Sequence, residues 1–245
     1  MSLPARNKKF EAPGQFSYEF KVLNHDRVLV FDNEKCIGCG LCVYACPIEG
    51  DVISVTGRDD EQISINLEKC VHCGACDYFC PADALTLYIN GDERIELKEP
   101  AGEVERHSLP DFEFIELKRK NSEQIVRKYL RGALLFPDEF PGNLKKKAIE
   151  ACPTGALSMA KESSKVKLDE KLCFFCDACS NATGGAIRVS RNYMMMEFSE
   201  GVPPLIKRII ERLMGEKTAS RLLKGVSQAK GQDQVKTLMR GLSKE

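Results

Sequence analysis

CIGCGLCVYACP, at residues 36–47, and CVHCGACDYFCP, at residues 70–81, are two copies of one pattern in this sequence. In each copy three cysteines are separated by two residues, and a fourth follows after three more residues, directly before a proline. Proline has no N–H and a fixed φ, so it ends the local turn and directs the chain into the next segment. The repeat therefore indicates two copies of one local structure that is organised by its cysteines.

This spacing suits cysteine ligation of two [4Fe-4S] clusters. Three closely spaced cysteines can wrap one face of a cuboidal cluster, and the fourth is carried by the following turn to the other cluster. Glycines between the ligands allow unusual dihedral angles and bring backbone N–H groups near sulfur. The expected ligand sets are Cys36, Cys39, Cys42 and Cys80 for the first cluster, and Cys70, Cys73, Cys76 and Cys46 for the second.

Other uses of these eight cysteines fit the spacing less well. A disulfide framework needs an oxidising compartment, and residues 1–16 have no apolar segment of the kind that directs secretion. Structural zinc prefers two separated pairs of cysteines, whereas each run here offers a triplet and a more distant Cys-Pro. The sequence therefore favours iron-sulfur clusters.

The remaining four cysteines predict a third cluster. Cys152 precedes a proline, and Cys173, Cys176 and Cys179 repeat the triplet spacing. When the first pattern is laid over this region, the four unfilled ligand positions are Gly142, Lys145, Ala148 and Thr183. These four positions would together have held one cluster, so their combined loss indicates a degenerate second domain. That domain keeps one set of ligands: Cys152, Cys173, Cys176 and Cys179.

Two alternatives stay open for these cysteines. In a nested pairing the first run would combine with the last, which would leave Cys80 without a partner set and give the Cys36 triplet only Thr183 as its fourth position. Sequential pairing completes three sets, and we prefer it. The last set could instead hold zinc, because four thiolates also satisfy that ion, or a [3Fe-4S] cluster.

Charge is distributed unevenly along the 245 residues, although the formal net charge is zero. Residues 32–96 carry thirteen acidic and four basic side chains, a net charge of −9, whereas residues 203–245 carry ten basic and four acidic ones, a net charge of +6. The acidic region resembles a docking face, and the basic tail an attachment element. No apolar run is long enough to span a membrane. The tail has no aromatic residue for base stacking, which argues against nucleic acid.

The expected fold is α+β and has five regions. They are an N-terminal extension at 1–31, a two-cluster ferredoxin-like domain at 32–99, a linker with a helix at 100–141, a degenerate one-cluster domain at 142–200 and a basic helical tail at 201–245. Strands are expected at 18–23, 27–31, 52–56, 64–67, 84–89, 94–97, 157–159, 166–168, 187–190 and 194–198. Helices are expected at 122–135, at 143–151 and from Pro204 onward, the last with an apolar stripe suited to burial against a larger protein.

Residues 32–88 resemble a bacterial-type two-cluster ferredoxin, and the whole cysteine-bearing region resembles a polyferredoxin. The resemblance implies an electron-transfer subunit of an anaerobe, especially a methanogenic archaeon. Such subunits serve hydrogenases, formate or formylmethanofuran dehydrogenases and heterodisulfide reductases. It implies redox proteins as partners. The cysteine spacing predicts three [4Fe-4S] clusters as cofactors, and the basic, apolar-striped C-terminal tail is expected to dock on the partner complex. The resemblance also implies a cytoplasmic location, free or peripheral to a membrane complex.

We recognise no catalytic constellation, phosphate loop or dinucleotide fingerprint in the sequence, so any oxidoreductase activity is expected to belong to the larger complex. A structural or redox-sensing iron-sulfur protein is the alternative of a different class. Loss of four ligands in the second domain favours that alternative, whereas two complete adjacent sets in the first domain favour electron transfer.

Overall fold

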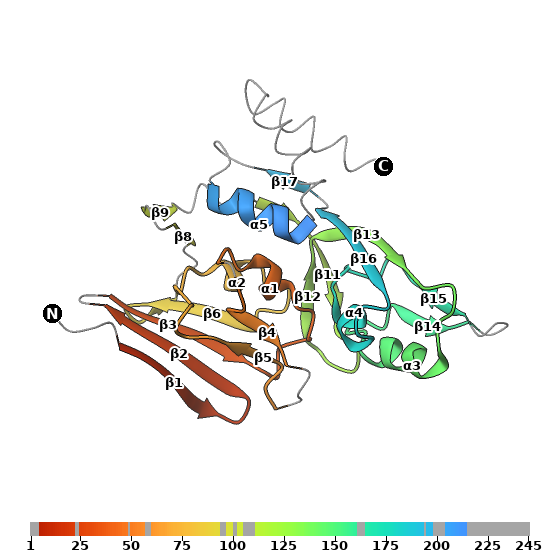
Figure 1. The fold of residues 1–245 in the computed structure, drawn as a ribbon, viewed down its shortest axis with the longest axis horizontal. Coiled ribbons are helices and arrows are strands. Elements are labelled where there is room, and N and C mark those ends of the chain that lie inside the picture. The colour runs from red at the N-terminus through yellow and green to blue at the C-terminus, as the bar shows by residue number, and fades with distance from the viewer. Residues whose placement is uncertain are drawn as a thin grey trace, which may run out of the picture.

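The computed structural model describes residues 5–22, 25–48, 50–56, 60–93, 97–99, 102–104, 111–160, 165–193, 195–197 and 204–214. Two halves of the molecule lie side by side, with a hairpin between them and the C-terminal helix over the first half (Figure 1). All twelve cysteines fall within the described residues, and all are buried.

The first half combines an antiparallel sheet with the cysteine-bearing loops, which lie between the sheet and the C-terminal helix (Figure 1). The strand order in this sheet is β1-β2-β3-β6-β7. Every second residue of β3 and of β6 is buried, as expected for strands with one face on a core. The elements of this half are β1 (Ala5–Ala12), β2 (Gln15–Val22), β3 (His25–Asp32), α1 (Leu41–Ala45), β4 (Ile53–Val55), β5 (Ile63–Ile65), α2 (Ala75–Tyr78), β6 (Leu85–Ile89) and β7 (Asp92–Glu93).

The strands predicted at 18–23, 27–31, 52–56, 64–67 and 84–89 are confirmed as β2, β3, β4, β5 and β6. Asn90 and Gly91 have positive φ, 53° and 86°, and form the turn between the paired strands β6 and β7. The strand expected at 94–97 lies partly outside the described residues.

The prediction that residues 1–31 form a separate N-terminal extension is wrong. β1 pairs with β2, β2 with β3 and β3 with β6, so these three N-terminal strands belong to the sheet of the first half. β1 itself was missed because six of its eight residues are exposed, leaving little apolar alternation to read. The boundary expected at residue 32 therefore falls within a continuous domain.

The second half repeats the element order of the first. The order β3-α1-β4-β5-α2-β6 corresponds to β13-α3-β14-β15-α4-β16, and in both cases the outer strands pair antiparallel. The helix predicted at 143–151 and the strands at 157–159 and 166–168 are confirmed. The elements are β13 (Leu130–Leu135), α3 (Gly142–Glu150), β14 (Leu157–Met159), β15 (Val166–Leu168), α4 (Ala178–Ala182) and β16 (Arg188–Tyr193).

The helix predicted at 122–135 is wrong. Ile125–Lys128 forms β12, which pairs with β11 (Ile115–Lys118), and Leu130–Leu135 forms β13, which pairs with β16. Gly132 lies so close to Ser190 in this pairing that a Cβ would come 1.8 Å from the Ser190 carbonyl oxygen. The apolar spacing suited a helix, but strand partners distant in sequence decided the structure. As a result, the second half begins before the expected boundary at residue 142.

The helix expected from Pro204 is confirmed as α5 (Pro204–Met214), but its apolar face is not free for a larger protein. Leu205, Ile206, Ile209, Ile210 and Leu213 are at most 5% exposed, and α5 packs against α1 of the first half. The sequence could not show this return of the chain, because an apolar stripe does not identify its partner. The rest of the tail lies outside the described residues.

Short strand pairs complete the described structure. β8 (Leu97–Glu99) pairs with β9 (Gly102–Val104), and β10 (Asp111–Glu113) pairs with β17 (Met195–Glu197). β16 and β17 correspond to the strands expected at 187–190 and 194–198, although they pair with β13 and β10 rather than with each other. None of the helices in the described ranges is long and apolar enough to cross a membrane.

Candidate functional site

The cysteines gather into three groups that match the expected ligand sets, and we name them here. Site 1 is Cys36, Cys39, Cys42 and Cys80; site 2 is Cys46, Cys70, Cys73 and Cys76; site 3 is Cys152, Cys173, Cys176 and Cys179. The structure brings the members of each set together, as described below. Ligation of a cluster by each set stays a prediction.

Site 2 surrounds a single cavity. Its four cysteines line that cavity together with apolar side chains that include Leu29, Val52 and Ile53. Cys46 follows α1, whereas the other three cysteines come from the second run, so the fourth member crosses over from the first run as the spacing predicted. The donor set and its apolar surroundings fit a thiolate-held cluster.

Site 3 has the same construction in the second half. Its four cysteines line one cavity with Leu134, Leu157 and Phe174. Cys152 lies just after α3, and the other three belong to the loop that enters α4. The second half therefore holds one complete set of four thiols in an apolar pocket.

The members of site 1 are close enough together for the charge on one thiol to shift the pKa of another. Burial is the main cause that raises the pKa of the Cys39 thiol, and negative charge on Cys80 and Cys36 raises that pKa further. Cys42 is affected in the same way by Cys39, Cys36 and Cys80. Cys80 thus approaches the first triplet, which is the crossover needed to complete site 1.

One backbone feature recurs in all three triplets. Gly38, His72 and Phe175, each two residues after the first cysteine of its triplet, have left-handed φ values of 64°, 50° and 54°. Their N–H groups donate to the sulfurs of Cys36, Cys70 and Cys173, respectively. Phe175 holds this conformation despite its bulky side chain, so the third triplet keeps the loop shape of the other two.

Burial favours the neutral form of several of these thiols when no metal is bound. It raises the pKa of Cys36 and of Cys173 to about 11, although an N–H donor opposes the shift in both cases. It raises the pKa of Cys73 to about 12. Because iron is bound by thiolates, assembly at these sites must release protons to solvent.

The four unfilled positions have other structural uses. Gly142, Lys145 and Ala148 lie in α3, and Ala148 is fully buried. Thr183 follows α4, and its hydroxyl donates to the carbonyl oxygens of Cys179, at 2.8 Å, and Ser180, at 3.2 Å. Three of the positions that do not match the cysteine pattern thus lie in α3, and the fourth caps α4.

Site 1 and site 3 are directly connected. The Asp177 N–H, in the site 3 loop, donates to the Cys39 carbonyl oxygen at 3.1 Å. After burial, negative charge on Cys39 is the strongest influence that raises the pKa of Cys176, ahead of the other members of site 3. Gly40 has a left-handed φ of 72°, which glycine adopts without strain, and a Cβ there would lie 2.9 Å from the Asn181 side-chain nitrogen.

A buried ion pair supports that connection. The Arg191 guanidinium donates to the Asp177 carboxylate, and both side chains are about 5% exposed. The same guanidinium lies over the Tyr44 ring of α1, 4.7 Å from its centroid. The pair therefore joins the site 3 loop, β16 and α1. Sequence reasoning missed it because Asp177 and Arg191 are ordinary residues whose partners depend on the fold.

α5 contributes a cation beside site 2. The Arg212 guanidinium donates to the carbonyl oxygens of Cys46, Ile48, at 3.2 Å, and Val43, at 3.3 Å. These carbonyls lie at and after the end of α1, where helical partners are lacking. The tail helix thereby fixes the segment that carries Cys46.

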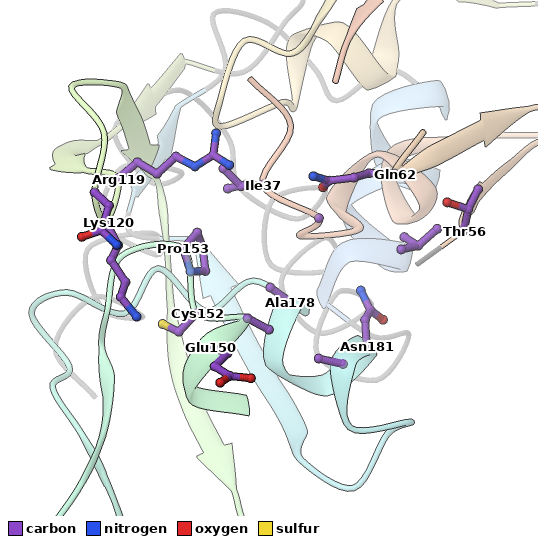
Figure 2. Close-up of a pocket in the computed structure, with 15 residues that line it drawn as sticks. Ile37, Thr56, Gln62, Arg119, Lys120, Glu150, Cys152, Pro153, Ala178 and Asn181 are labelled. Carbon is purple, nitrogen blue, oxygen red and sulfur yellow. The ribbon is translucent and has the colours of Figure 1, made fainter. Parts of the chain in front are cut away.

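A cleft lies between the two halves, with a volume of about 820 Å³. Arg119 and Lys120 stand on one side of it, Gln62 and Asn181 on the other, and Cys152 between them (Figure 2). The β11–β12 hairpin forms one wall and contacts both Cys-Pro segments. Lys120 N–H donates to Pro153 oxygen, and Arg127 N–H donates to Pro81 oxygen.

Comparison with known proteins agrees with this architecture. Residues 35–84 match the family of 4Fe-4S dicluster domains. The fold is similar to that of a chain in the formate dehydrogenase - heterodisulfide reductase - formylmethanofuran dehydrogenase complex from Methanospirillum hungatei. That match has a TM-score of 0.67 and 20% identity, and it covers 87% of this chain and 92% of the other. No curated protein sequence matches.

The predicted two-cluster iron-sulfur domain is therefore confirmed at residues 35–84. The structural match, at 20% identity, shows a shared fold across most of the chain. The dicluster match at residues 35–84 supports the electron-transfer role that the sequence predicted.

Proposed function

We propose that this chain is a polyferredoxin-type relay that holds three [4Fe-4S] clusters, one at each of sites 1, 2 and 3. When bound, such clusters each accept and donate single electrons at potentials set by hydrogen bonds, charge and burial. The observation that carries the proposal is that all twelve cysteines fall into three complete sets of four. In the proposed fold, residues 130–193 form a degenerate ferredoxin-like domain that keeps one of two cluster sites.

The contacts between sites support a linear order with site 1 in the middle. Cys42 lies close enough to Cys76 to influence its pKa, after burial and the nearer Cys73 and Cys70. Cys39 lies close enough to Cys176 to raise its pKa in the same way. The residues of site 1 thus reach toward site 2 on one side and site 3 on the other.

We also propose that the relay serves a larger oxidoreductase in the cytoplasm of an anaerobe. The similar chain in Methanospirillum hungatei belongs to a complex that contains formate dehydrogenase, heterodisulfide reductase and formylmethanofuran dehydrogenase. Its similarity over nearly the full length of both chains supports a subunit role of this kind. Attachment through residues 215–245, the rest of the basic tail, is part of the proposal.

Reductive titration of the anaerobically purified protein, followed by electron paramagnetic resonance, tests this function. The relay predicts reversible uptake of about three electrons per chain, with spectra broadened by interaction between neighbouring reduced clusters. Irreversible loss of iron on reduction would instead favour a structural role. Reversible reduction with no electron delivery to any redox protein would favour a sensor.

A further inference from the structure

We propose that the cleft between the halves is an electron-exchange port that binds a carboxylate-bearing segment of an anionic redox partner. This inference rests on the proposed function. Its first support is position. Ile37 and Gly38 of the site 1 loop line the cleft, and so does Cys152 of site 3.

Cys152 and Pro153 separate the cleft from site 3. Both residues line the cleft, and both also line the site 3 cavity. A group bound in the cleft would therefore contact a ligand residue of site 3 and, across the cleft, the loop of site 1. Electron exchange favours such short separations, and the cleft offers them at two sites at once.

The charges in the cleft favour an anion. Arg119 and Lys120 line it, opposed by the single carboxylate of Glu150. Arg119 is fixed in place, because its guanidinium donates to the Glu34 carbonyl oxygen at 2.7 Å and the Gln124 amide oxygen at 2.8 Å. Within the described ranges, the exposed Lys120 ammonium group has no hydrogen-bond or ion-pair partner. One fixed and one available cation suit a carboxylate ligand.

The other lining residues point to a polar segment rather than an aromatic cofactor. The Gln62 side-chain amide points across the cleft toward Arg119 (Figure 2), whereas the Asn181 amide lies in the cleft beside Gly40; both can donate hydrogen bonds. None of the described residues that line the cleft is aromatic, so a ring system would find no stacking surface. The volume of about 820 Å³ lies in the range of sites for extended ligands.

The positive charge in the cleft contrasts with the negative net charge of the first half. Residues 32–96 carry a net charge of −9, which repels an acidic partner from most of that surface. A local cationic site in such surroundings restricts where the partner can dock. Like-charge repulsion elsewhere then contributes orientation as well as specificity.

Kinetics with two small oxidants test the port in the reduced, full-length protein. The anionic cobalt(III)–EDTA complex and the cationic cobalt(III) hexaammine each accept one electron, so one reduced cluster is oxidised for each cobalt(III) reduced. We expect Lys120→Glu to slow the anionic reaction at least about fivefold at low ionic strength and to leave the cationic reaction unchanged or faster. Lys167→Glu is the matched control, because Lys167 is exposed on β15 outside the cleft and undergoes the same charge change.

Binding of a hexaglutamate peptide, measured by calorimetry, supplies a readout that needs no reduction. The proposal expects the peptide to bind the wild type, to bind Lys120→Glu at least about fivefold more weakly, and to inhibit the anionic oxidant competitively. Equal peptide binding by both proteins would overturn it. Slower anionic oxidation without peptide binding would also overturn it, since the cleft would then be a site for small anions only. Failure of the relay itself would appear separately, as incomplete iron content or irreducible clusters in the wild type.

Discussion

The two halves of this molecule share one order of strands and helices but differ in what supports the segment before the first Cys-Pro. In the first half that segment is a loop with Cys36 and Cys39, followed by the five-residue helix α1, which contains Cys42. In the second half it is the nine-residue helix α3, with Gly142, Lys145 and Ala148 at the corresponding positions. Backbone hydrogen bonds of α3 and a buried Ala148 stand where the first half has cysteines. Under the proposed function, a cluster loop in one half and a helix in the other therefore support equivalent places of the fold.

The difference has a consequence for stability. A loop held by ligands depends on its metal for folding free energy, whereas a helix carries its own hydrogen bonds. The first half contains eight of the twelve cysteines and the second half four. The two halves should therefore respond unequally to loss of iron.

Removal of iron by an anaerobic chelator should have the largest effect. We expect amide exchange in α1 and α2 to accelerate by on the order of ten thousandfold, equal to roughly 5.5 kcal/mol, because both helices continue directly from cysteine loops. Exchange in α3 should accelerate by about a hundredfold or less. Hydrogen–deuterium exchange with mass spectrometry measures both, and equal losses in the two halves would contradict the comparison.

Asp177→Asn should cost about 3–5 kcal/mol of stability, because it leaves the Arg191 guanidinium buried without a countercharge. It should also weaken the magnetic interaction between sites 1 and 3, measured by electron paramagnetic resonance, while site 2 keeps its spectrum. Asp83→Asn is the matched control. Its carboxylate pairs with Arg127 but is 67% exposed, so the cost should stay below about 1 kcal/mol.

Gly132→Ala should cost about 2–3 kcal/mol, because its Cβ would overlap the Ser190 backbone and force β13 away from β16. The loss should appear in denaturant unfolding of the second half. Gly142→Ala makes the same chemical change inside α3, where a Cβ meets nothing within 4 Å. It should stabilise the protein by about 0.5–1 kcal/mol. Similar effects of the two substitutions would show that β13–β16 pairing does not support this half.

Arg212→Ala should cost about 1.5 kcal/mol through loss of its hydrogen bonds to the carbonyls around Cys46. The effect should fall on site 2, seen as faster loss of its iron to chelator, with site 3 unchanged. Lys207→Ala on the exposed face of α5 should alter stability by less than about 0.5 kcal/mol. If both variants lost site 2 iron at the wild-type rate, α5 would not stabilise that site.

The cysteine spacing predicted the grouping of the sites because ligand chemistry restricts a local backbone strongly. The same restriction made the strands around the first two runs readable. The predicted strand pairs and α3 in the second half followed from the repeat of that pattern. These features depend on residues near one another in sequence.

What the sequence could not predict depends on distant partners. β12 and β13 carry apolar residues at helical spacing, and only pairing with β11 and β16 selects strands. β1 is an exposed edge strand without a clear pattern. The Asp177–Arg191 pair and the Arg212 contacts join residues 14 and 166 positions apart in their hydrogen bonds. Local sequence patterns do not indicate partners that are this far apart in the sequence.

The most direct test of the central claim is the iron, acid-labile sulfide and zinc content of the anaerobically purified chain, beside that of its Cys152→Ser variant. The account predicts about 12 iron and 12 sulfide in the wild type, and about 8 of each in the variant, with little zinc in either. About 8 iron with about one zinc in the wild type would contradict it and make the second half a structural zinc module.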